Sequence, residues 1–422
     1  MLTFQTPDSR PLYPIQSLSA KYPTFAAVNI KKIILKRGKE VALQRRHPWL
    51  FSGAIHKVEG EPKNGEIVHV YSAEGQALAT GFYSRGSIAI RLFEFDAVEP
   101  TAQYWSAKIG KAIAFRKSIG LYGAKDTNVF RLFNAEGDGI PGLIIDFYNG
   151  VAVIQCHTHG TYALRATFTD ALKDNLGNDL KAVYDKSAES LGEEGAENGY
   201  LYQAKGTNYD EVQTVTENGF QFAIDWVSGQ KTGFFIDQRD NRKLLGQYAK
   251  GKKVLNTFCY TGGFSVYALA AGATLVHSVD SSLRAVEMTD HNVELNMKDA
   301  NHESFSDDVF SFFKNYPETY DVIVLDPPAF AKHMNARHSA IIAYKRLNAE
   351  AFKRINKGGI VFTFSCSGVV TRELFEGAVT AAAIEAGRNV RVLTRLGQPA
   401  CHPVSIFHSE GEYLKGLVLY VE

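Results

Sequence analysis

The chain has 422 residues, of which 45 % are hydrophobic and 22 % charged, and its formal net charge is +1. This is the composition of an ordinary soluble globular protein with about two to four domains. No apolar run approaches the roughly 18–20 residues of a membrane helix, and the N-terminus lacks an apolar signal-peptide core. We therefore expect a cytoplasmic protein without a membrane partner. Cysteine spacing predicts no metal site, so we expect reduced thiols at Cys156, Cys259, Cys366 and Cys401.

Residues 1–27 hold four of the 13 prolines and show no hydrophobic period, which predicts an N-terminal extension. Residues 28–100 follow as a small β domain. Glycines separate its strand-like runs at turn spacing, a pattern typical of a small barrel or sandwich. The expected strands cover residues 28–35, 66–71, 77–83 and 88–93.

The first part of this β domain is strongly basic. Residues 28–57 contain eight lysines and arginines against one glutamate, together with Trp49 and Phe51. Basic side chains beside aromatic rings suit RNA, although a solvated surface explains the charges as well. For Trp49 a place in the core is the better interpretation. The predicted RNA-binding residues are Lys31, Lys32, Lys36, Arg37, Arg45 and Arg46.

Residues 101–217 predict a small α+β middle domain, because strands surround a helix. The pair Asn149-Gly150 is a strong sequence signal for a β-hairpin turn. Arg131 and the turn at 136–139 could reach a substrate, but turn chemistry explains the turn equally well. The expected helices are 104–119 and 161–176, the expected strands are 129–133, 143–148, 151–156 and 182–185, and 186–200 is an expected loop.

From residue 218 to 422 strands alternate with helices, which predicts a parallel sheet covered on both faces. A hairpin begins at Asn218-Gly219. Residues 252–280 then have the order strand, glycine turn, helix, strand and acid, which is the first βαβ unit of a nucleotide-binding sheet. Helix 338–355 and strand 360–364 follow later in the chain.

The glycine turn of this unit, Thr261-Gly262-Gly263, would let the backbone approach a ligand closely. Asp280 lies 18 residues after Gly262, where it can accept hydrogen bonds from ribose hydroxyls. Neither a Gly-x-Gly-x-x-Gly nor a Gly-Lys-Ser/Thr motif is present, which disfavours a dinucleotide or a nucleoside triphosphate. An adenosine ligand without phosphates fits better, and S-adenosylmethionine is the common one. An ordinary crossover with a tight turn is the alternative.

Two further stretches could contribute to such a ligand site. Asp308 follows a weak strand and offers a carboxylate to an adenine amino group. Every residue from Asp237 to Arg242 has an ionisable or amide side chain, a density that favours a cofactor lid over a solvated helix start.

A carboxylate and a thiol are predicted at neighbouring strand ends. Asp326 follows the buried strand 320–325 and is held by two prolines, and Cys366 follows strand 360–364. A thiolate that adds to C6 of cytosine makes C5 nucleophilic, and a carboxylic acid at N3 lowers the barrier to that addition. A base must then remove the C5 proton. The alternative for Cys366 is a buried core cysteine.

Three motifs together resemble those of a known family. They are residues 255–264 (LNTFCYTGGF), 326–330 (DPPAF) and 363–368 (TFSCSG), and the stretches 232–242 and 411–416 are similar as well. The resemblance is to the bacterial cytosine-C5 methyltransferases of 23S rRNA that carry an N-terminal PUA domain, and it covers about residues 28–422. It implies a multidomain α/β protein with a PUA-like β-barrel, an α+β middle domain and a C-terminal Rossmann-like class I methyltransferase domain. It also implies rRNA processing, S-adenosylmethionine as cofactor, 23S rRNA as partner and a homodimer.

The resemblance also implies roles for individual residues. Cys366 would be the nucleophile. Asp326, from its place at the strand end, is predicted to serve both catalysis and cofactor binding. Asp280 would hold the ribose and Asp308 the adenine. The other implied cofactor residues are Gln238, Arg239, Asn256, Phe258, Tyr260 and Gly262.

Two other functions remain open. A methyltransferase that acts on a nitrogen, such as guanine N7 in rRNA, needs no covalent intermediate because nitrogen already has a lone pair; Cys366 argues against it. A non-catalytic RNA-binding assembly factor is the third possibility, and the glycine turn, Asp280 and Asp326 argue against it.

Overall fold

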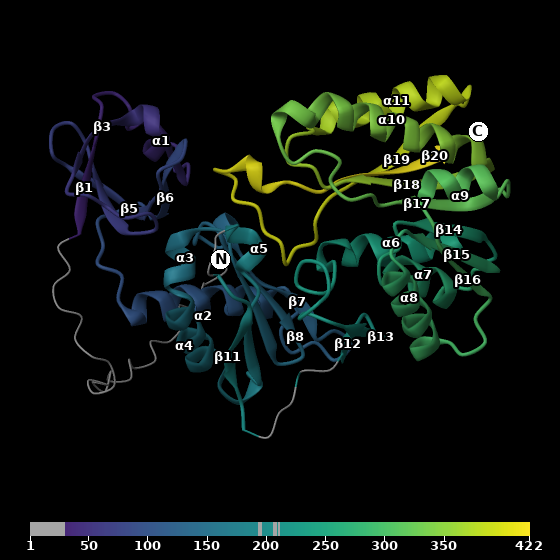
Figure 1. Ribbon diagram of the computed structural model, residues 1–422, viewed down its shortest axis with the longest axis horizontal. Coiled ribbons are helices and arrows are strands. Elements are labelled where there is room, and N and C mark those ends of the chain that lie inside the picture. Colours follow the sequence, from purple (N-terminus) through teal and green to yellow (C-terminus); the bar gives the residue numbers. More distant parts are fainter. Residues whose placement is uncertain (1–29, 193–195, 206–208, 210–211) are drawn as a thin grey trace, which may run out of the picture. The chain divides into compact units, whose positions relative to one another are not determined.

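The computed structural model describes residues 30–192, 196–205, 209 and 212–422 (Figure 1). The expected extension at 1–27, the first two residues of the expected strand 28–35 and part of the expected loop 186–200 lie outside these ranges. Residues 31–422 belong to one compact unit.

The N-terminal β domain is a six-stranded sheet in the order β2-β6-β5-β4-β1-β3. Strand β1 pairs parallel with β4 and antiparallel with β3. Alternating residues such as Ile33, Leu35, Val68 and Val70 are fully buried and form its core. The elements are β1 (Lys31–Leu35), α1 (Val41–Gln44), β2 (Trp49–Phe51), β3 (Ile55–Glu59), β4 (Ile67–Tyr71), β5 (Ala77–Tyr83) and β6 (Ile88–Glu94).

The middle domain has a five-stranded sheet in the order β11-β10-β9-β8-β7, and helices α2 and α4 pack against each other beside it (Figure 1). The expected hairpin is confirmed, since Asn149 and Gly150 both have positive φ, as a tight turn of this type requires. The expected helix 161–176 is interrupted at Leu164. The elements are α2 (Ala102–Ser118), β7 (Val129–Asn134), β8 (Leu143–Tyr148), β9 (Val151–Cys156), α3 (His159–Ala163), α4 (Arg165–Leu176), β10 (Ala182–Asp185), α5 (Ala188–Leu191) and β11 (Gly199–Gln203).

A second confirmed hairpin leads into the C-terminal domain. Asn218 and Gly219 again have positive φ, and they join β12 (Gln213–Glu217) to β13 (Phe220–Ile224). The large sheet that follows has the order β16-β15-β14-β17-β18-β20-β19. Its first five strands are parallel, as expected. Strand β20 is antiparallel to both β18 and β19, so the complete sheet is mixed.

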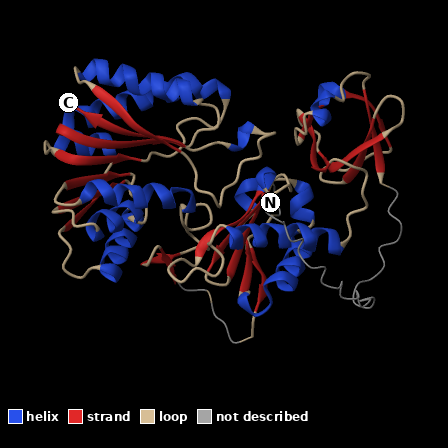
Figure 2. Ribbon diagram, turned by 180° about the vertical axis from the view of Figure 1, so that it is seen from behind, coloured by secondary structure: helices blue, strands red, loops and turns tan. Residues whose placement is uncertain are grey.

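Helices cover both faces of this sheet, as expected (Figure 2). Helices α6, α7 and α8 pack in sequence on one face, and α9, α10 and α11 pack together on the other. The elements are α6 (Arg239–Ala249), β14 (Lys253–Thr257), α7 (Gly263–Ala270), β15 (Leu275–Asp280), α8 (Leu283–Asn296), β16 (His302–Ser306), α9 (Val309–Asn315), β17 (Tyr320–Leu325), α10 (Arg337–Arg354), β18 (Ile355–Ser365), α11 (Arg372–Ala386), β19 (Val390–Leu396) and β20 (Lys415–Val421). Among the described residues, no helix has the length and hydropathy needed to cross a membrane.

A buried ion pair connects the second hairpin to α6. The guanidinium of Arg242 donates to both carboxylate oxygens of Glu217 over 2.9 and 2.7 Å and to the carbonyl of Phe235 over 2.9 Å. Tyr267 also donates to Glu217. Both charged side chains are almost completely buried.

We predict that Arg242→Met lowers the free energy of unfolding by about 3–5 kcal/mol, because it leaves the carboxylate of Glu217 buried without its counter-ion. The double variant Arg242→Met/Glu217→Leu should recover a large part of this loss, since neither charge then has to be desolvated. Urea denaturation of the wild type and the two variants measures both effects. A loss of under about 1 kcal/mol in the single variant, the range of exposed ion pairs, would show that the pair is not buried in solution.

Candidate functional site

The ends of three adjacent parallel strands form the centre of the candidate site. Strand β14 pairs with β17, and β17 pairs with β18, so that Thr257, Leu325 and Thr363 lie side by side. The segments that follow these strands therefore leave the same edge of the sheet. Cys366 is adjacent to the Asp326 segment, because its Sγ lies 3.8 Å from the carbonyl oxygen of Pro327. The two segments that carry the thiol and the carboxylate are thus neighbours at the sheet edge.

Asp326 is a carboxylate that resists ionisation. Burial, together with the negative charge of Asp237, raises the pKa of Asp326 to about 7. A hydrogen bond of 2.9 Å from Nε2 of Gln238 and the charge of Arg242 oppose this rise. At neutral pH both protonation states are populated, so this side chain can accept and return a proton.

Cys366 is protonated at rest. Burial raises the pKa of the Cys366 thiol to about 12, and the charges of Asp326 and Asp237 add to the rise, while Lys231 opposes it. A nucleophilic thiolate at this position therefore requires a group that takes the proton. Asp326, at the neighbouring strand end, is a candidate for this role because its charge acts on the thiol.

Asp237 is a second carboxylate at the site. The phenol of Tyr413 donates to its Oδ2 over 2.7 Å, and its buried Oδ1 has no hydrogen-bond partner among the described residues. Asp237 contributes to the raised pKa of both Asp326 and Cys366. From the sequence, Asp237 was predicted only as the start of a lid. No role at this site was predicted for Lys231 or Tyr413, because only the folded structure brings them close to it.

The expected cofactor lid is instead a buried part of the domain. Gln238, Arg239, Asn241 and Arg242 are all almost fully buried at the start of α6. Gln238 is fixed between Asp326 and the amide of Asn241. The Nη1 of Arg239 is buried without a hydrogen-bond partner among the described residues, so it is free to bind an anionic or carbonyl group of a ligand.

The glycine turn after β14 has an unusual backbone. Phe258 and Tyr260 have φ of +54° and +47°, and Gly262 has φ of +76°. Left-handed conformations at non-glycine residues cost free energy and concentrate at functional sites. The sequence analysis explained Gly262 by the close approach of a ligand, but this explanation is incomplete. A Cβ at this position would lie 2.6 Å from Cγ2 of Thr289 on α8. Close packing of α8, rather than ligand approach alone, requires glycine.

The predicted ribose and adenine carboxylates lie at the expected strand ends. Asp280 accepts backbone hydrogen bonds of 3.0 Å from Tyr260 and from Ser282, one on each oxygen, and both oxygens keep a further lone pair for hydroxyl groups. Asp308 caps α9 through Oδ1, which accepts from the amides of Phe310 and Ser311. The helix cap explains Asp308 without a ligand, so its adenine role stays a prediction.

Asn256 is the predicted cofactor residue that the structure favours least. Its side chain is buried and donates to Oγ of Ser265 over 2.9 Å. The hydroxyl of Ser265 is hydrogen-bonded to the hydroxyl of Ser278, which is in turn hydrogen-bonded to the ring of His302. The amide of Asn256 therefore belongs to an internal polar chain between β14, α7 and β15.

A cavity of about 120 Å³ lies beside the glycine turn. The turn at 228–233, Tyr260 and the start of α8 with Ser282 and Arg284 line it. Of the predicted cofactor residues, Tyr260 contacts this cavity. Its hydroxyl also accepts from the amide of Gln230 and donates to the carbonyl of Gly233, which connects the 228–233 turn to the glycine turn.

Two expected substrate contacts in the middle domain are structural. Arg131 forms a bidentate ion pair with Asp146. Oδ2 of Asp146 also accepts a hydrogen bond from the hydroxyl of Thr232. Asp138, in the turn at 136–139, forms a bidentate ion pair with the buried Arg116. These side chains are therefore occupied in holding the middle domain together.

The basic cluster of the N-terminal domain is largely solvent-facing. Lys31 is the exception, since its Nζ donates to Glu66 and to the carbonyl of Glu61. Trp49 is only partly buried and its Nε1 donates to Glu136 over 2.8 Å, so the core position expected for it was wrong. The exposed members are Lys32, Lys36, Arg37, Arg45 and Arg46.

Comparisons with known proteins agree with this architecture. Residues 33–95 match the model of a PUA-like domain, and residues 204–400 match that of an S-adenosylmethionine-dependent methyltransferase. A Ribosomal RNA large subunit methyltransferase I from Shewanella amazonensis is 39 % identical over 401 residues, covering 92 % of this chain and 99 % of the relative. The protein of the same name from Tolumonas auensis is 39 % identical over 398 residues, covering 92 % and 98 %. This chain belongs to that methyltransferase family.

Solved structures extend the comparison to the cofactor. An S-adenosylmethionine-dependent methyltransferase from Streptococcus mutans is 25 % identical with a TM-score of 0.79, covering 92 % of this chain and 99 % of that one. A methyltransferase crystallised with S-adenosylhomocysteine (SAH) has a TM-score of 0.80 at the same identity and coverage. The predicted domain types, the Rossmann-like class of the C-terminal domain and the cofactor S-adenosylmethionine are confirmed. The free nitrogen of Arg239, the carboxylate of Asp280 and the glycine turn fit such a ligand.

We predict that Asp280→Ala weakens S-adenosylmethionine binding between about tenfold and a hundredfold, because it removes charged acceptors for the ribose hydroxyls. Isothermal titration with S-adenosylmethionine and with SAH measures the effect. Asp299→Asn, an exposed carboxylate after α8, is the matched control and should bind as the wild type does. An unchanged dissociation constant in Asp280→Ala would remove Asp280 from the cofactor site.

Proposed function

We propose that this protein transfers the methyl group of S-adenosylmethionine to C5 of a cytosine in large-subunit ribosomal RNA, with Cys366 as covalent nucleophile and Asp326 as proton carrier. The observation that carries the proposal is the thiol of Cys366 beside the Asp326 segment at the ends of β17 and β18. The names of the relatives support ribosomal RNA as substrate. The PUA-like domain, with its exposed basic residues, supports an RNA partner.

Asp326 begins the reaction by accepting the proton of the Cys366 thiol. The thiolate then forms a bond from Sγ to C6 of the cytosine, while the electron pair of the C5–C6 double bond moves toward N3. The protonated Asp326 donates its proton to N3, so no charge builds up on the ring. The pKa of Asp326, about 7, suits a group that performs both transfers.

The cofactor supplies an electrophilic methyl group to the activated C5 carbon. Loss of the methyl group would leave the cofactor as S-adenosylhomocysteine. A base then removes the C5 proton, the electron pair restores the C5–C6 bond, and the bond from Sγ to C6 breaks. N3 returns its proton to Asp326, which passes it to the departing thiolate of Cys366. The two prolines after Asp326 and the hydrogen bond from Gln238 hold the carboxylate in place through these steps. Binding and orientation of the cofactor fall to Asp280, Arg239 and the glycine turn.

Nitrogen methylation of rRNA is the second candidate. The raised pKa of the Cys366 thiol favours this second candidate. A cysteine that only packs in the core would also be largely buried and protonated. The third possibility, a non-catalytic assembly factor, is disfavoured by membership of a methyltransferase family.

We predict that wild-type protein incubated with S-adenosylmethionine and RNA containing 5-fluorocytosine forms a covalent complex on a denaturing gel. Fluorine cannot leave C5 as a proton does, so the C6–thiolate adduct should accumulate. Cys366→Ala should form no complex and lose methyl transfer, while its affinity for S-adenosylmethionine stays nearly unchanged. Cys259→Ala, a buried thiol on the glycine turn, controls for other cysteines. Methyl transfer to ordinary RNA without any trapped complex would favour nitrogen methylation.

We predict that kcat/KM rises with pH through about 7 and then levels off, because Asp326 must be ionised to take the thiol proton. Gln238→Leu should move this rise to higher pH, since the lost hydrogen bond stabilises the ionised form. Single-turnover methylation of RNA across the pH range measures both profiles. A rate that falls through about 7 would mean that the protonated carboxyl is the reactive form and that another base serves Cys366.

A further inference from the structure

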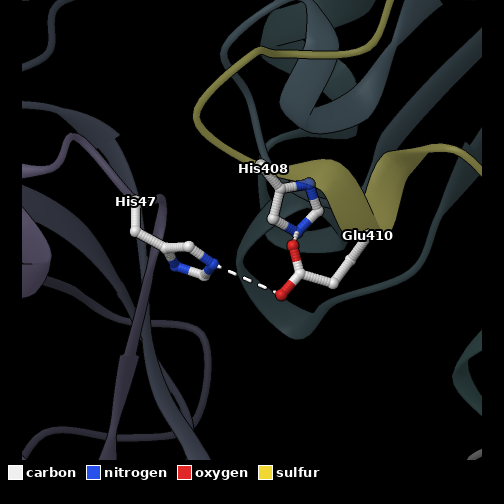
Figure 3. Close-up of side chains that lie close together, drawn as sticks. All are labelled: His47, His408 and Glu410. Carbon is white, nitrogen blue, oxygen red and sulfur yellow. Dashed lines mark ion pairs between the residues drawn. The ribbon is translucent and has the colours of Figure 1, made fainter.

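A second cluster of titratable side chains lies outside the methyltransferase site. His47 comes from the PUA-like domain, between α1 and β2, and His408 and Glu410 come from the segment between β19 and β20 of the methyltransferase domain. Figure 3 shows the rings of both histidines turned toward the carboxylate of Glu410. One ligand atom from each residue lies within 4.8 Å of the others.

The distances in this cluster are close to those of a metal site. Nε2 of His47 is 3.5 Å from one oxygen of Glu410, and Nε2 of His408 is 3.8 Å from the other. Bond lengths of about 2.0–2.2 Å to a tetrahedral zinc ion place its ligand atoms about 3.4 Å apart. The ligand atoms lie within 4.8 Å of one another, so binding one ion would require the side chains to rotate toward this spacing.

His408 gives an independent indication of a ligand. It is only 3 % exposed, yet neither of its ring nitrogens has a hydrogen-bond partner among the described residues. Trp49 packs against it with the ring centroids 4.4 Å apart. A buried imidazole whose two nitrogens make no hydrogen bond is rare in folded proteins and calls for an explanation such as a bound ion.

His47 is oriented as a metal ligand requires. Its Nδ1 lies 3.3 Å from the carbonyl oxygen of Trp49, so a proton on Nδ1 can be donated to that carbonyl and Nε2 is left free to bind. Without a metal, the amide of Trp49 donates to the same Nδ1 over 3.1 Å, and Nε2 then carries the proton and faces Glu410. The ring position is the same in both tautomers.

We propose that His47, His408 and Glu410 bind a divalent transition-metal ion of the zinc class, with water as the fourth ligand. Two imidazoles and one carboxylate favour such an ion over magnesium or calcium, which prefer oxygen ligands. Because the ligands come from two domains, the ion would fasten the PUA-like domain to the segment between β19 and β20. This proposal is independent of the chemistry assigned to Cys366.

The test is metal titration of untagged, full-length protein that has been treated with a chelator. The wild type should bind one equivalent of Zn²⁺, and Co²⁺ should give the visible absorption of a tetrahedral site. His47→Ala and Glu410→Gln should each weaken Zn²⁺ binding by at least about tenfold, the loss known for even indirect partners of metal ligands. Both positions are partly exposed, so these variants should fold where His408→Ala would risk misfolding.

Two control variants identify the site. His56→Ala removes an exposed histidine on β3 of the same domain, and Cys401→Ser removes a thiol that lies 3.3 Å from Nδ1 of His402. Both should bind Zn²⁺ as the wild type does. If Zn²⁺ binds equally well to His47→Ala and Glu410→Gln, the ion lies elsewhere and the proposal is wrong. If the wild type binds no Zn²⁺, the cluster is only a group of ion pairs and the proposal is equally overturned.

Discussion

Burial of the Asp326 carboxylate is the constraint around which the methyltransferase domain is arranged. A pKa of about 7 in place of 3.8 corresponds to a cost on the order of 4 kcal/mol for ionising this group in the folded protein. Because the folded-state pKa is raised, that cost applies as the pH rises above about 4 and is complete above about 7. The packing of β14, β17 and β18 must offset it, and Gln238 reduces it through one hydrogen bond.

The strained turn after β14 depends on the packing of α8. Thr289 fills the space that a side chain at Gly262 would need, and Asn292 donates to the carbonyl of Thr261 over 2.8 Å. The other end of the Asn292 amide accepts from the backbone of Ala223 in β13 over 2.7 Å. Helix α8 thus stabilises both the glycine turn and the hairpin before it. The left-handed residues Phe258 and Tyr260 persist because these contacts, and the carboxylate of Asp280, fix the backbone around them.

Short sequence patterns correctly predicted the features that depend on neighbouring residues, such as turns and strand ends. Both Asn-Gly hairpins were identified because that pair tolerates two positive φ angles, and the strand ends at Asp280 and Asp326 followed from apolar runs that stop at an acid. Strand β20 was not predicted, so its antiparallel direction was missed as well; an apolar run reads the same in either orientation. Partnerships across strands were also missed: nothing near Arg131 in the sequence indicates that it pairs with Asp146. The cluster around His408 joins two domains and has no local signal at all.

The charges around Cys366 are the opposite of those at a permanently activated cysteine. Two carboxylates, Asp326 and Asp237, raise its pKa, and Lys231 opposes them only partly. The two titrations are therefore coupled, because a proton on Asp326 removes the larger of the two charge effects that suppress the thiolate. In the proposed mechanism, moving the thiol proton to Asp326 both creates the nucleophile and stabilises it. In that mechanism a nucleotide whose N3 takes the proton completes the transfer, so the proposal requires the thiol to stay inert until a suitable base occupies the site.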